Sequence, residues 1–196
     1  MKRCMVLGLV LLLASPVLAQ SDTSKFLGDL ASKYSGALTA VKYTVDMETG
    51  AKTVLGQGVC ISNEAQLGVF LTTALDPRMN VESLKDFQIL TAGVDGKTLK
   101  AKLLGVDPWT GLGFVQATEK AEWQVVQFAR ASNLQPGQLV GSVGLMMGDP
   151  ARPAYLGLAY VSTVMRTPGE MVYVTGGRLT GTCSPVFTAE IGRAHV

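Results

Sequence analysis

Few residues in this chain can do acid–base or nucleophilic chemistry near neutral pH. The chain has one histidine, His195, next to its last residue, and its body holds two cysteines, Cys60 and Cys183. An imidazole is the side chain whose ordinary pKa suits a base near pH 7. A thiol is intrinsically nucleophilic, but it still needs a neighbouring base and an acid for the leaving group. The position of His195 therefore decides how much of this chemistry the protein can have.

The last seven residues have an unusual sequence. Residues 190–196, EIGRAHV, match the translation of a common sequencing adapter followed by a stop codon. We interpret 190–196 as an adapter-derived tail, with a genuine polar tail as the alternative. This interpretation leaves the natural segment without a histidine and makes it part of a longer protein.

The first residues predict an export signal. Lys2 and Arg3 precede an apolar run, and small side chains follow at Val17–Ala19. This is the pattern of a signal peptide over 1–19, cleaved after Ala19, and it predicts a secreted or periplasmic protein. The alternative is a membrane anchor, for which the run is short. After cleavage we expect no transmembrane span.

The composition of the remaining segment, 20–189, excludes some classes of function. It holds 14 basic and 14 acidic residues, so it lacks the basic excess of a nucleic-acid groove. Its cysteines form no CxxC motif and have no histidine partner, so we expect no metal and no cofactor. In an exported protein Cys60 and Cys183 can form a disulfide, or they can remain separate buried thiols. The length suits one domain or two small barrels.

Hydrophobic periodicity predicts one helix followed by strands. Residues 24–36 place apolar side chains at helical spacing, and the period then changes to the alternation of strands. About ten short strands with turns between them indicate an all-β barrel or sandwich. The predicted strands include 37–46, 53–62, 67–75, 86–92, 98–107, 112–118, 139–147, 154–166 and 170–176.

Several of these segments resemble one family when they are taken in order. GQGVCISNEAQLGVFLTTALD is similar to a Gly-x-Gly hairpin that leads into Thr-Asn-Ala-His, and DPWTGLG is similar to Asp-Pro-x-Thr-Asp-Leu-Ala. GRLTGTCSPVF lies where the same family has Gly-Asn-Ser-Gly-Gly-Pro. The chain thus resembles the HtrA-like (Deg) branch of the trypsin-fold serine proteases over nearly all of 26–187. The resemblance implies two perpendicular β-barrels, one in 20–118 after a short helix and one, incomplete at its C-terminal end, in 119–189.

The residues of the family's catalytic triad are missing from the matching positions. The histidine falls on Leu75 and the aspartate on Gly111, while the serine falls on Thr182 or Cys183, with Ser184 as a third option. Leucine cannot accept a proton and glycine cannot orient a base, so a nucleophile here would stay unactivated. Asp76 is a conceivable substitute base, but an aspartate before a proline is more often a turn residue.

Other side chains have a structural and a ligand-binding interpretation. Arg152 and Arg178 could meet a substrate carboxylate, or they are solvated surface. Large apolar side chains are expected to pack in the barrels, with contact to a ligand as the alternative: Trp109, Trp123, Met146, Met147 and Met165.

The sequence leaves three functions open. The first is a pseudoprotease whose cleft between the barrels binds a peptide or a partner protein. The second is an active endopeptidase whose catalytic residues are displaced or misread. The third is a structural subunit of a homo-oligomer or of an active paralogue. The resemblance also implies that further strands, and a PDZ domain in many relatives, follow residue 189.

Overall fold

The computed structural model describes residues 22–73, 75, 80–92, 96–129, 134–166, 171–188 and 194–195. The signal peptide predicted for 1–19, the possible base Asp76 and most of the proposed tail at 190–196 lie outside these residues. None of the described helices is long and apolar enough to span a membrane.

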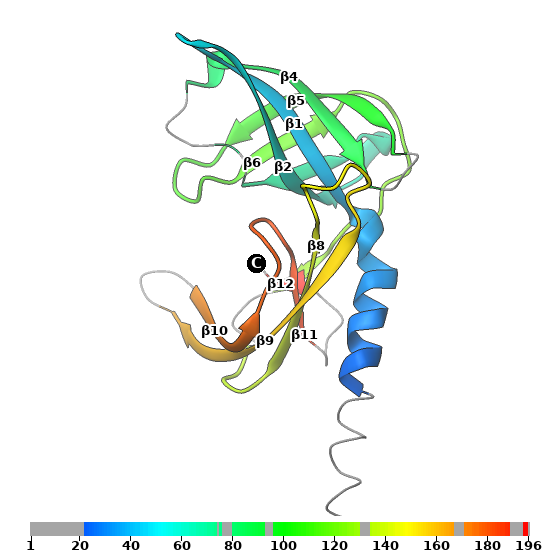
Figure 1. Cartoon of the computed structure of the whole chain (residues 1–196), viewed down its shortest axis with the longest axis vertical. Helices are drawn as coiled ribbons and strands as arrows, with labels where there is room; N and C mark the ends of the chain where they lie inside the picture. Colours follow the sequence, from blue (N-terminus) through cyan, green and yellow to red (C-terminus); the bar gives the residue numbers. More distant parts are fainter. Residues whose placement is uncertain are drawn as a thin grey trace, which may run out of the picture.

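The chain folds into two bodies of strands, with one helix beside them (Figure 1). The first body is a closed barrel in the order β1-β2-β3-β6-β5-β4. Its strands are β1 (Leu38–Met47), β2 (Gly50–Ser62), β3 (Val69–Thr72), β4 (Leu84–Thr91), β5 (Thr98–Val106) and β6 (Gly113–Ala117). Short 3₁₀ turns lie at Ser35–Ala37, Glu64–Gln66 and Val81–Ser83.

Alternating side chains fill the interior of the barrel. On β1 the alternate residues Val41, Tyr43 and Val45 point into one core, as the period of two in a strand requires. Tyr43 stacks on Phe87 of β4 with ring centroids 5.3 Å apart. This core is closed on all sides because β1 pairs with both β2 and β4.

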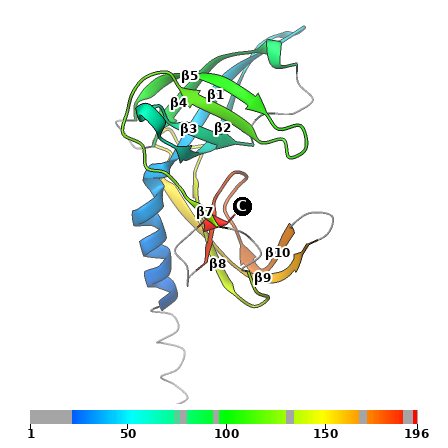
Figure 2. The same ribbon diagram turned by 180° about the vertical axis from the view of Figure 1, so that it is seen from behind.

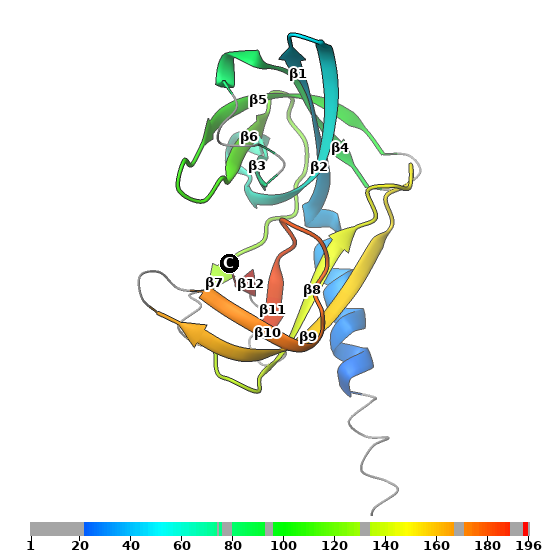
Figure 3. The same ribbon diagram turned by 60° about the vertical axis from the view of Figure 1, so that its left-hand side comes forward.

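The second body is an open sheet of six strands in the order β10-β9-β8-β11-β12-β7. Figure 3 shows β10 at its outer edge. A small apolar cluster, which includes Val140, Ala159 and Val161, lies on one face. The strands are β7 (Phe128–Ala129), β8 (Leu139–Leu145), β9 (Ala154–Met165), β10 (Met171–Arg178), β11 (Val186–Thr188) and β12 (Ala194–His195).

The helix at 22–34 runs alongside the second sheet and leads into the barrel (Figures 1 and 2). Its residues Leu30 and Tyr34 join a core that also contains Leu71 of the barrel and Phe187 of β11. The rings of Tyr34 and Phe187 stack with centroids 4.2 Å apart. The helix and both strand bodies therefore share one apolar junction, which fixes the cleft between the bodies.

These observations confirm the all-β fold with a short N-terminal helix, a closed barrel and a second body of strands that is not closed. One predicted strand was too long. The apolar pattern of 67–75 predicted strand throughout, but β3 ends at Thr72. The chain leaves the sheet there, and Leu75 packs elsewhere in the core.

Candidate functional site

Three segments that are distant in sequence meet between the barrel and the second sheet. They are the residues after β3, the turn before β6 and the loop 181–185. A pocket of about 240 Å³ at their meeting point is lined by Thr73, Leu112, Cys183 and Ser184, among others. The structure thus brings together the segments in which the family resemblance places a catalytic triad.

Leu75, at the position of the family's histidine, is part of the barrel core. It is 3% exposed and contacts the core cluster that contains Phe70 and Val115. Its side chain occupies the space beside Gly113, where an added Cβ would lie 2.2 Å from Leu75 Cδ1. The matching motif of the family has an alanine where this chain has Gly113. The two departures are therefore coupled, because the larger residue at 75 needs the smaller residue at 113.

Gly111, at the position of the family's aspartate, lies in a tight turn and has a φ of +72°. Its N–H donates to the Asp107 carbonyl oxygen at 2.8 Å. The Asp107 carboxylate accepts from the Thr110 hydroxyl and from the Trp109 N–H. These two hydrogen bonds lower the pKa of the Asp107 carboxyl. This carboxylate stabilises its own turn and is not the orienting partner of a base.

Trp109 corrects the prediction that it packs in a barrel. It is 94% exposed, at the tip of the turn after β5. Trp123 confirms the same prediction, since it is buried and meets Phe70 edge to face with centroids 4.8 Å apart.

The loop 181–185 holds a residue other than glycine in the left-handed region of backbone conformation. Thr182 is exposed, whereas Cys183 has a φ of +63°. This left-handed conformation costs a residue with a Cβ about 1–2 kcal/mol. The loop keeps Cys183 there although no glycine relieves the strain.

The N–H groups that could form an oxyanion hole are already bonded within the protein. In trypsin-like enzymes this hole uses the N–H of the nucleophile and the N–H two residues before it. If Thr182 is at the nucleophile position, the second donor is Thr180, whose N–H donates to Ser142 Oγ at 2.8 Å. If Cys183 is at that position, the second donor is Gly181, whose N–H donates to the Tyr155 hydroxyl at 2.7 Å. In either alignment a side-chain hydroxyl occupies one of the two donors.

Both cysteines have free thiols, and both thiols are protonated near neutral pH. Burial raises the pKa of the Cys183 thiol to about 11, and a backbone hydrogen bond from Thr73 offsets this in part. Burial likewise raises the pKa of Cys60 to about 11. The Cys183 thiol donates to the Leu71 carbonyl oxygen at 3.2 Å. Neither cysteine is poised as a thiolate nucleophile.

No disulfide joins Cys60 to Cys183, although the sequence left that pairing open. Cys60 faces the interior of the barrel. Its neighbour Val59 faces the other way, into the junction against which Cys183 packs. The two sulfur atoms therefore lie on opposite sides of β2, and a bond between them would require a different backbone.

Gln57 connects the two bodies at this site, and it was not among the residues predicted from the sequence. Its side chain is buried and donates to the Cys183 carbonyl oxygen at 2.9 Å and to Ser184 Oγ at 3.0 Å. Its Oε1 accepts from the Leu145 N–H at 2.6 Å. The available signal was a polar residue between two glycines, in the stretch 54–61 of β2 that is otherwise apolar. Without coordinates, that signal does not identify the partners.

The remaining candidates are spread around the site. Arg152 is half-buried, and its Nη2 donates to the Thr91 carbonyl oxygen at 3.1 Å, which ties the β8–β9 hairpin to the barrel. Arg178 is exposed at the end of β10. Met147 packs against the junction, whereas Met146 and Met165 are exposed. Among the described residues, no three carboxylate, thiol or imidazole groups gather as metal ligands would.

Comparisons with known proteins show the fold. No protein-family model matches the chain, and no curated protein matches it by sequence. Solved structures do match, and one of them is the HtrA-type protease AlgW with a tripeptide. Its TM-score is 0.59 and its identity is 19%, over 86% of this chain and 52% of that chain. The chain thus has the trypsin-like fold of an HtrA-type protease, and it spans about half the length of that protein.

Proposed function

We propose that this chain is an exported pseudoprotease, in which a trypsin-like fold without catalytic machinery binds an extended peptide or a segment of a partner protein between its two strand bodies. The observation that carries the proposal is the burial of Leu75 against Gly113 at the position of the catalytic histidine. A core leucine cannot move a proton, and losing the activated nucleophile in a protease of this kind removes on the order of a millionfold in rate.

Two further observations support inactivity together with a retained cleft. The N–H groups of Thr180 and Gly181 donate to hydroxyls of the second sheet, so a transition-state oxyanion would find too few free donors. The pocket lined by Thr73, Leu112 and Cys183 remains at the junction. The structural neighbour is described with a tripeptide, which favours a peptide as the ligand of such a cleft.

The test uses fluorescein-labelled casein, an extended and unfolded chain, for both halves of the proposal. We expect no release of labelled fragments and no labelling of the protein by a serine-reactive phosphonate, with an active HtrA-type protease as the positive control. Sustained turnover that is abolished by Thr182→Ala or Cys183→Ala would show that the chain is an endopeptidase and would overturn the proposal.

The same probe measures binding by fluorescence anisotropy. Thr73 is exposed and lines the pocket, so Thr73→Trp fills the cleft without disturbing the core. Thr98→Trp places the same bulk on an exposed position of β5 in the barrel. We expect Thr73→Trp to weaken casein binding and Thr98→Trp to leave it unchanged. Equal binding by both variants and the wild type would place the ligand elsewhere and contradict the assignment of the cleft.

A further inference from the structure

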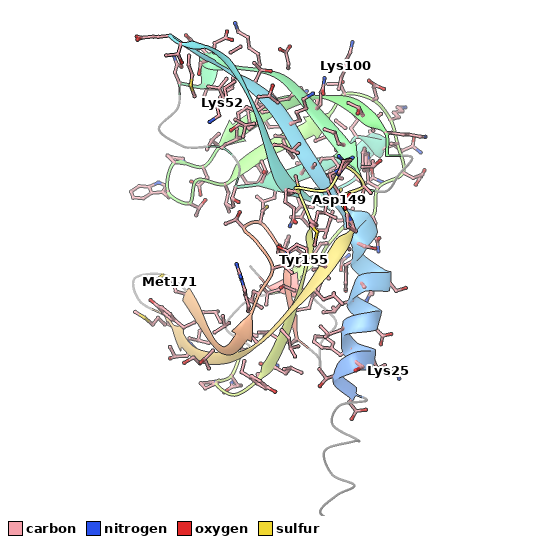
Figure 4. All side chains as sticks on the ribbon, in the orientation of Figure 1. Lys25, Lys52, Lys100, Asp149, Tyr155 and Met171 are labelled. Carbon is pink, nitrogen blue, oxygen red and sulfur yellow. The ribbon has the colours of Figure 1, made fainter. Side chains whose placement is uncertain are left out.

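A second pocket lies on the other side of the loop that carries Cys183. It has a volume of about 620 Å³ and lies between the start of β9 and the segment 178–182. Figure 4 labels Tyr155 at the beginning of β9, in the region between the two strand bodies. Residues 181 and 182 of the loop 181–185 line this pocket, and residues 183–185 of the same loop line the pocket at the cleft, so the two pockets are neighbours along the chain.

The described residues give this pocket a positive charge. Arg178 lines the pocket and is exposed, and none of the described residues that line it is acidic. Among the residues that the structure describes, no carboxylate forms an ion pair with Arg178. A guanidinium presents a planar set of donors that matches a carboxylate in a bidentate way.

The backbone before Arg178 is built to place this side chain. The pairing of β10 with β9 shifts register between Thr175 and Arg178. The bulge contains Gly176, which has a φ of +69°, and Gly177, where an added Cβ would lie 2.0 Å from the Leu158 carbonyl oxygen. Only glycine fits such a position, and bulges re-aim the side chains that follow them. The bulge therefore fixes the backbone position of Arg178 at the end of β10.

Two hydroxyl groups add donors beside the guanidinium. The Tyr155 hydroxyl accepts from the Gly181 N–H, so its own hydrogen is available to a ligand. A hydroxyl that already accepts a hydrogen bond is polarised toward stronger donation. The exposed Thr182 also lines the pocket. An anion with two oxygens is the ligand that satisfies a guanidinium and two hydroxyl donors together.

We propose that the pocket formed by Arg178, Tyr155 and Thr182 binds a carboxylate of the peptide that occupies the neighbouring cleft. This inference rests on the proposed function and names the ligand preference of that site. The carboxylate comes from an acidic side chain or from the C-terminus of the peptide, and both present the same two oxygens. The same loop that no longer supports an oxyanion thus acts as the wall of an anion-binding pocket.

The test is a competition in which peptide pools displace fluorescein-labelled casein from the full chain. The first pool is blocked at both ends and has glutamate at its central position, the second has glutamine there, and the third has glutamine and a free C-terminal carboxylate. All other positions are mixtures of neutral residues. We expect the first or the third pool to displace casein at about one tenth of the concentration that the second needs, since a hydrogen-bonded charge pair contributes that much affinity. The pool that does so identifies the source of the carboxylate.

Three variants connect this preference to the pocket. We expect Arg178→Gln to make the pools equal and Arg178→Lys to keep part of the preference, because an ammonium lacks the fork of the guanidinium. Arg166→Gln removes the same charge just past the far end of β9, about 26 Å along the strand from Leu158, the sheet partner of Arg178, and we expect it to change nothing. A thermal melt of each variant separates altered binding from altered folding.

The outcomes separate the inference from the function on which it rests. Equal displacement by all three pools on the wild-type protein overturns the carboxylate preference and leaves peptide binding intact. A preference that survives Arg178→Gln overturns the assignment to this pocket. Absence of casein binding overturns the proposed function and the inference together.

Discussion

The first barrel closes on itself, with β1 hydrogen-bonded to both β2 and β4, whereas the second sheet runs from β10 to β7 and ends in two edges. The difference is visible in burial. Most of β1 is buried, whereas seven of the eight residues of β10 are exposed. Strand edges are sites where backbone groups lack partners. The candidate site therefore lies between a closed barrel and a sheet that, over the described residues, is open.

The two bodies contribute different residues to the site. The barrel supplies Leu75 from its core and Gln57 from β2, and the second sheet supplies the loop 181–185 and Arg178. The predictions below compare matched changes in the two bodies.

The largest effect is expected from an aromatic residue in each body. Phe70 is fully buried in the barrel, whereas Tyr173 is exposed on β10. We expect Phe70→Ala to lower the free energy of unfolding by about 4 kcal/mol, through lost burial and the cavity left behind. Tyr173→Ala should change it by about 0.5 kcal/mol or less. Urea denaturation followed by tryptophan fluorescence measures both, and equal losses would refute the idea that the barrel dominates stability.

A smaller effect is expected at the connection between the bodies. Gln57→Leu removes the side-chain acceptor of the buried Leu145 N–H and two hydrogen bonds to the loop. We expect a loss of about 2 kcal/mol, because a buried donor without a partner keeps its desolvation penalty. Gln127→Leu is the control on an exposed position. Hydrogen exchange at Leu145 should speed up in the first variant alone, and an unchanged exchange rate would mean that Gln57 is not the connection.

The two thiols report on the two bodies separately. Cys60 lies inside the barrel, and Cys183 lies in the loop of the second sheet. We expect Cys183 to react with a disulfide reagent at pH 8 at least about ten times faster than Cys60, because local opening of an open sheet costs less than opening a closed barrel. The variants Cys60→Ala and Cys183→Ala assign the two phases. If Cys60 reacted first, local opening of the barrel would cost less free energy than local opening of the second sheet.

A further effect is a loss of stability in alkali. Both thiols have pKa values raised from the ordinary 9.0 to about 11, so the unfolded chain releases these protons at lower pH than the folded chain. The stabilisation is therefore complete below pH 9 and is lost as the pH rises toward 11. We expect the fall in the free energy of unfolding between pH 8.5 and about 10.5 to be shallower in the double variant with alanine at 60 and 183. Parallel slopes would show that other groups cause the fall.

The strands were predictable because their signal is local. Alternation along 37–46 and 98–107 fixes which side chains face the core, and the observed strands β1 and β5 follow those bounds within a residue. The end of β3 was not predictable in this way. Leu75 continues the apolar pattern, and the pattern does not encode that its side chain fills the space beside Gly113 rather than a place in the sheet.

The contacts that define the site could not be predicted from the sequence, for a different reason. Gln57 meets Cys183 across 126 residues of sequence, and Thr180 meets Ser142 across 38. Such pairings depend on how two bodies dock, which no local period records. Trp109 shows the opposite error. Its size favoured burial, but Trp109 lies in a tight turn formed by the hydrogen bonds of Asp107, and its side chain is exposed.

The packing of Leu75 on Gly113 constrains the mutational routes that lead away from this sequence. Histidine at 75 would place a polar ring in an apolar core, where its nitrogen atoms need partners that the cluster around Phe70 does not offer. Alanine at 113 would collide with the leucine that is already there. Each of these single substitutions is therefore unfavourable on its own. The residues at 75 and 113 constrain each other, so a change of side-chain chemistry at 75 is expected to need a compensating change in its surroundings.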